Sequence, residues 1–105
     1  MRLPLILAEG FDVHVFGSAA ELVSHTELPD VAEGIFDCFD ADALALRLVV
    51  EERSRISLVE DVPRMYKRER LIEILKGSLA SNRRAKGLTI PGRLEELIAL
   101  VKQYQ

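Results

Sequence analysis

The chain has 105 residues, of which 49% are hydrophobic, and this predicts one folded domain over residues 1–105 and excludes a disordered chain. Its net charge of −3 hides an asymmetry, because residues 1–61 carry 13 carboxylates against 4 Arg while residues 62–105 carry 10 Lys and Arg against 4 Glu. The single cysteine, Cys38, excludes an internal disulfide, and no segment reaches the roughly 18 apolar residues of a membrane span. We therefore expect a cytoplasmic protein with no membrane partner.

The first half has the pattern of short strands around one helix. Ser18 and Glu21 form a capping-box pattern, which predicts a short helix ending near His25. Pro29 and Asp30 indicate a turn after this helix. Apolar runs and period-two alternation predict the strands, with Gly10 in the first hairpin turn. The expected strands are residues 3–8, 11–16, 34–39, 44–50 and 56–59.

After Asp61 the apolar period becomes that of a helix. Asp61 can cap a helix with Pro63 in its first turn, and apolar residues recur at helical spacing from Met65 to Leu79. A basic loop and Pro91 precede a second helix. Strands followed by helices predict an α+β fold: a mainly antiparallel sheet with helices packed on one face and two helices at the C-terminus.

The alternation also assigns side chains to sheet faces. It places Val13 and Cys38 under the helices, and His14 and Phe39 on the outward face. His14 and Cys38 would then lie on opposite faces, so no thiolate–imidazole pair is expected. The sequence also lacks a phosphate loop, a nucleophile motif and a zinc motif. We expect no enzyme activity, no cofactor and no metal site.

Carboxylates gather at two of the predicted hairpins, with apolar residues between them on the outward face. Apolar anchors ringed by charge are typical of specific protein interfaces, and a dense negative surface steers a basic partner. The other interpretation is that carboxylates at turns only keep the protein in solution. The predicted partner-binding residues are Asp37, Phe39, Asp40, Asp42, Glu51 and Glu52.

The basic second half indicates a different function. Arg83, Arg84 and Lys86 follow a predicted helix that carries Arg64, Lys67, Arg68 and Arg70, and such clusters are the electrostatic signature of nucleic-acid binding. A pI near 5.4 and a single interleaved aromatic, Tyr66, stand against it. A solvated helix face explains the same charges. A small nucleic-acid-binding regulator remains the alternative function.

The segments Val13–Leu22, Glu27–Val31 and Glu33–Asp42 form a pattern of strand, capped helix and acidic hairpin. This pattern resembles small immunity proteins. These accompany bacterial polymorphic toxins, including contact-dependent growth inhibition systems. The sequence departs from the pattern at Ala43, where a hairpin Gly is expected. The resemblance implies a toxin-inhibitor role: binding a cognate protein toxin, often a basic nuclease domain, and blocking it in the cytoplasm. The resemblance covers roughly residues 5–60.

Overall fold

The computed structural model describes residues 1–105 and contains one five-stranded sheet in the order β2-β1-β3-β4-β5. Every neighbouring pair of strands is antiparallel. The strands are β1 (Leu5–Glu9), β2 (Asp12–Phe16), β3 (Asp37–Phe39), β4 (Ala45–Glu51) and β5 (Arg55–Glu60). The helices are α1 (Ala19–Ser24), α2 (Leu28–Glu33), α3 (Arg68–Ser81) and α4 (Leu94–Tyr104), with 3-10 turns η1 (Glu52–Ser54) and η2 (Arg83–Ala85). The α+β prediction with two C-terminal helices is confirmed.

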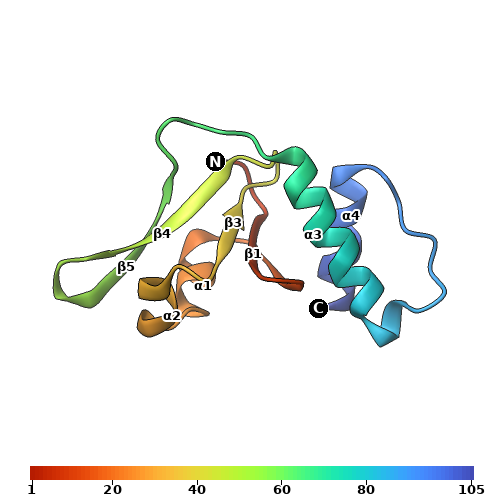
Figure 1. Ribbon diagram of the computed structural model, residues 1–105, viewed down its shortest axis with the longest axis horizontal. Helices are drawn as coiled ribbons and strands as arrows, with labels where there is room; N and C mark the ends of the chain where they lie inside the picture. The colour runs from red at the N-terminus through yellow and green to blue at the C-terminus, as the bar shows by residue number, and fades with distance from the viewer.

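The sheet lies between two helical layers, as Figure 1 shows, with α3 and α4 on one side and the short α1 and α2 on the other. Each layer buries its own core. The larger core joins Ile6, Val13, Val15 and Phe39 to the apolar faces of α3 and α4. The smaller core has Leu5, Leu7, Leu22, Cys38, Leu44 and Leu46. Alternate residues of β1, which lies between β2 and β3, therefore enter different cores.

The β4–β5 hairpin, residues 45–60, projects beyond both helical layers and is called the arm below (Figure 1). It contributes to the elongated shape of the molecule, whose longest axis is 46 Å. At its tip, η1 turns the chain with Arg53 and Ser54 at positive φ. The arm exposes more of its apolar side chains than the centre of the sheet does, since no helix covers its end.

Local sequence signals explain the N-terminal elements. Gly10 turns the β1–β2 hairpin at φ +61°, a conformation that Gly adopts without steric cost. The Ser18 hydroxyl accepts a hydrogen bond from the Glu21 amide at 3.2 Å, as the cap predicted. The expected turn at Pro29 is instead the first turn of α2, which ends at Gly34 with φ +70°. The strand expected from residue 34 consequently begins at 37.

The predicted start of α3 at Asp61 is wrong. The helix begins at Arg68, and the segment before it runs beside the β3–β4 loop. The Ala45 amide donates to the Met65 carbonyl at 2.8 Å, and the Lys67 amide donates to the Ala43 carbonyl at 2.8 Å. These interstrand bonds satisfy the backbone in an extended form, which the residue before a proline also favours. Met65 is exposed as a result.

The side chains were grouped correctly within β2 and within β3–β5, but the two groups were wrongly given one common face. Val13 lies under α3 and α4 as expected, whereas Cys38 lies on the face that α1 and α2 cover, and Phe39 lies under α3 and α4. Leu7 of β1 pairs with both His14 and Cys38, and directly paired residues point to the same face. His14 and Cys38 therefore share a face, and Val13 lies on the other. The error arose because β1 lies between β2 and β3, which a reading of each strand by itself does not reveal.

Candidate protein-interaction surface

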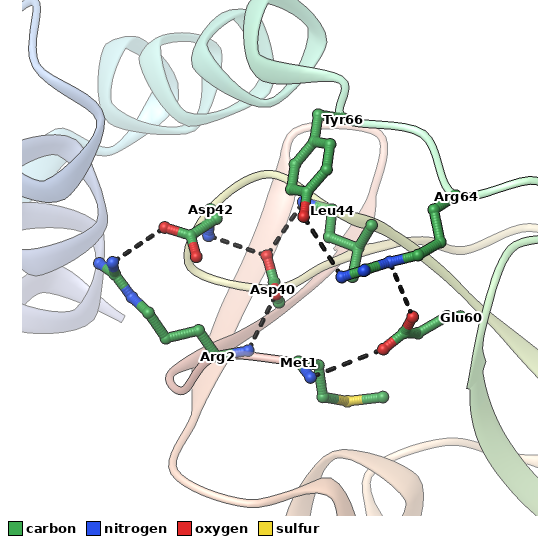
Figure 2. A network of polar contacts seen from close by, with 8 residues as sticks. All are labelled: Met1, Arg2, Asp40, Asp42, Leu44, Glu60, Arg64 and Tyr66. Carbon is green, nitrogen blue, oxygen red and sulfur yellow. Dashed lines mark hydrogen bonds and ion pairs between the residues drawn. The ribbon is translucent and has the colours of Figure 1, made fainter.

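Asp40, predicted to contact a partner, is instead a buried structural residue with 3% of its surface exposed. One carboxylate oxygen accepts from the amides of Asp42 at 2.8 Å and Leu44 at 2.9 Å, and the other accepts from the Arg2 amide at 2.9 Å. Figure 2 shows these bonds converging on Asp40 from the N-terminal segment and the following loop. Asp40 therefore holds the β3–β4 loop together and is unavailable to a partner.

Phe39 was expected to be an exposed anchor, and this is also wrong. Its side chain is 2% exposed and belongs to the larger core. The face of β3 that carries it is the one that α3 and α4 cover, so the ring is enclosed rather than presented. Its burial with Ile6 and Val15 makes it a packing residue.

The remaining predicted carboxylates are accessible but dispersed. Asp37 pairs with Arg70 of α3 at 3.4 Å, and Asp42 pairs with Arg2 at 2.9 Å near the N-terminus. Glu51 pairs with Arg55 at 2.6 Å near the tip of the arm, and this hydrogen bond lowers the pKa of Glu51. Glu52, at the tip, makes no ion pair. Three of these four charges are thus compensated within the chain, and they do not form one negative surface.

The residues considered for chemistry do not form a reactive pair. Cys38 is buried, and burial, followed by the charges of Asp37 and Asp61, raises the pKa of its thiol to about 12. Although His14 and Cys38 share a face, β1 separates their strands by about 10 Å. The His14 ring lies 4.5 Å from that of His25, centroid to centroid. No three His, Cys, Asp or Glu side chains are grouped so as to hold a metal ion.

Four further carboxylates lie on the layer formed by α1 and α2. We define the acidic face as the carboxylates of Glu21, Glu27, Asp30 and Glu33. None of them takes part in an ion pair, and only Asp30 is partly buried. A signal for this surface exists in the sequence, since residues 3–46 contain no Lys or Arg. The sequence interpretation missed it by concentrating on hairpins.

Apolar side chains adjoin the acidic face on the same side of the sheet. α2 lies against β4 and α1 against β5, so these helices cover the base of the arm. Beyond them, Val50 is exposed and its cross-strand partner Ile56 is partly buried. Partly buried Phe36, Leu48 and Leu58 lie nearer the core. This side of the molecule therefore combines uncompensated carboxylates with accessible apolar groups.

The basic residues lie mainly on the opposite side, so the charge asymmetry of the sequence becomes a separation across the sheet. Lys67 and Arg68 are at the start of α3, while Arg83 and Arg84 follow its end, and none of the four is in an ion pair. The length of α3 separates these pairs by about 20 Å. Arg84 also lies over the ring of Tyr104 at 5.8 Å. Exposed Lys76 lies between the two pairs near the middle of α3 and also has no ion pair, so the unpaired basic charges are spaced along the whole helix and the turn after it.

No protein-family model, curated protein or solved structure matches this chain. Among its helices, none has both the length and the apolar character needed to cross a bilayer.

Proposed function

We propose that this protein is an immunity protein that binds and neutralises a basic protein toxin, a nuclease being the best-fitting class, and that it acts in the cytoplasm. The observation that carries the proposal is the acidic face, whose four carboxylates have no internal ion-pair partner. Uncompensated charge of one sign raises the association rate of a partner of the opposite sign. The resemblance of residues 13–42 to immunity proteins supports the same role.

The proposed contact is the acidic face together with the exposed end of the arm, rather than the hairpin residues that the sequence favoured. Val50 and Ile56 supply apolar area beside the negative charges. A basic nuclease presents Lys and Arg around a site that must accept phosphates, which makes it complementary to such a surface. Neutralisation would then require only binding, and we propose no catalytic step by this chain.

The direct test is co-expression with a catalytically active form of the candidate toxin encoded by the adjacent gene. The chain should restore growth, and it should co-purify with the toxin domain in a defined ratio. A variant with Glu27→Gln, Asp30→Asn and Glu33→Gln should protect less well. Its matched control, Glu69→Gln, Glu73→Gln and Glu96→Gln, makes the same change in charge on the α3–α4 layer and should protect fully. Toxicity undiminished by the natural chain would refute the proposal.

Nucleic-acid binding is the second candidate, and the unpaired Lys67, Arg68, Arg83 and Arg84 favour it. The net charge of −3, however, disfavours the approach of a polyanion. Retention on heparin or duplex DNA at moderate salt, lost on changing Arg83 and Arg84 to Ala, would favour this function. Elution of the natural chain at low salt would leave the immunity role as the better account.

A further inference from the structure

One edge strand of the sheet, β2, is covered by the C-terminal residue, whereas the other edge strand, β5, is open. At the β2 edge, the side chain of Gln105 accepts from the Val15 amide at 2.6 Å and donates to the Val15 carbonyl at 3.1 Å. The end of α4 thus occupies hydrogen-bonding positions that another strand would use. β5 is the other edge, and it pairs only with β4. In Figure 1 no helix lies outside it.

The open edge has a composition that favours pairing. Residues 55–60 read Arg-Ile-Ser-Leu-Val-Glu, with no Lys or Pro among them, while the charged residues stand at the two ends of the strand and Pro63 follows it. The Asp61 amide donates to the Ala45 carbonyl at 3.2 Å. Because bonding alternates along an antiparallel ladder, the backbone groups of Ile56, Leu58 and Glu60 then point outward. Three consecutive outward positions are available to a further strand.

We propose that β5 pairs with β5 of a second copy of this chain, antiparallel and across a two-fold axis at Leu58. A two-fold axis normal to the sheet keeps each face continuous across the two copies. Even-numbered residues of one β5 must then oppose even-numbered residues of the other, and odd-numbered residues must oppose odd-numbered ones. The register centred on Leu58 satisfies this condition. It also places Arg55 opposite Asp61 of the second copy, and the symmetry repeats this pair at the other end. Within each copy Arg55 pairs with Glu51 at 2.6 Å and Asp61 pairs with Arg47 at 3.4 Å, so the new contact links these pairs into a row of alternating charges across the interface. The alternation of charge favours this register, and a second copy supplies both partners of each new pair.

The proposed dimer has a ten-stranded sheet with both acidic faces on the same side. The extension is lateral, so neither α1 nor α2 is covered by the second copy. The dimer would therefore leave the proposed toxin-binding surface free and present it twice. This inference does not depend on the proposed function, because it rests only on the open edge and its charges.

The test exchanges the charges of the predicted pair and measures mass by analytical ultracentrifugation up to millimolar concentration. The natural chain should dimerise. Arg55→Glu alone and Asp61→Arg alone should each weaken dimerisation on the order of tenfold or more, because like charges then oppose at both ends. An equimolar mixture of the two variants should dimerise again, since each contact then joins opposite charges. Arg53→Glu has the same charge change as Arg55→Glu but lies outside the register, and should dimerise like the natural chain.

Amide exchange locates the contact. The amides of Ile56, Leu58 and Glu60 should become protected as the concentration of the natural chain rises. A chain that stays monomeric at every concentration would overturn the proposal, and so would a dimer that both single variants retain. Protection of these amides only on addition of the toxin domain would mean that the toxin, and not a second copy, pairs with β5, and this would also overturn the proposal.

Discussion

Replacing Asp40 tests its assignment as a structural residue. The carboxylate accepts three backbone hydrogen bonds, two through one oxygen and one through the other. Asp40→Ala removes all three, and hydrogen bonds to a charged group each contribute about 1.5–3 kcal/mol when buried. Because the Arg2 amide and the Asp42 amide are only partly buried, water recovers part of this loss. We expect Asp40→Ala to lower the free energy of unfolding by about 3–5 kcal/mol.

Asp40→Asn provides the sharper comparison. Its carbonyl oxygen can keep the bonds from Asp42 and Leu44, while its amide group faces the Arg2 amide, donor against donor. A loss of about 1–2 kcal/mol is expected, which corresponds to a fall in Tm of about 5–15 °C. Asp42→Asn disturbs only an exposed ion pair and should cost less than about 1 kcal/mol. Urea unfolding followed by circular dichroism measures all three. Equal losses for Ala and Asn, or a loss below that of the Asp42 variant, would refute the assignment.

Further predictions concern the two cores and the helix surface. Leu75→Ala and Leu97→Ala should each cost about 2–5 kcal/mol in urea unfolding, whereas exposed Leu88→Ala should change stability by less than about 0.5 kcal/mol; small effects at Leu75 and Leu97 would mean that α3 and α4 are peripheral. A Cβ at Gly77 would lie 2.3 Å from the Phe11 ring, so Gly77→Ala should stabilise by about 1 kcal/mol only in a Phe11→Ala background. The same gain in both backgrounds would contradict this contact. Because the pKa of Cys38 is raised from 9.0 to about 12, its contribution is complete below pH 9 and declines toward pH 12, where the unfolded thiol ionises first. The natural chain should lose up to about 4 kcal/mol relative to Cys38→Ala over that range in unfolding titrations; parallel pH profiles would show that the thiol ionises equally in both states.

Local signals in the sequence predicted most of the elements but not how the layers are arranged. The cap at Ser18, the Gly10 turn and the alternation in β4 depend on neighbouring residues, and all three are confirmed. The insertion of β1 between β2 and β3 depends on distant contacts, and it placed Cys38 and Phe39 on the faces opposite to those expected. Asp61 offered a helix cap, yet hydrogen bonds to the β3–β4 loop kept the following segment extended.

In the candidate site, too, the sequence did not show which carboxylates are exposed. Asp40 and Asp42 differ by two positions in sequence, but one is buried under the backbone it supports and the other is exposed. Ala43, at the position where Gly was expected, has φ 68°, and the hydrogen bonds of Asp40 hold the loop in that form. Charge counting could have found the acidic face, because the segment without Lys or Arg includes both α1 and α2. Only the fold shows that its carboxylates lack ion-pair partners.

The proposal that the acidic face meets a basic toxin is tested most directly by association kinetics with the purified toxin domain at low and high salt. The natural chain should associate fast at low salt and slow steeply as salt screens the charges. Neutralising Glu27, Asp30 and Glu33 should reduce the low-salt rate about tenfold or more and flatten the salt dependence. Neutralising Glu69, Glu73 and Glu96 should leave both unchanged. Association rates that are equal for the two triple variants at every salt concentration would contradict the account.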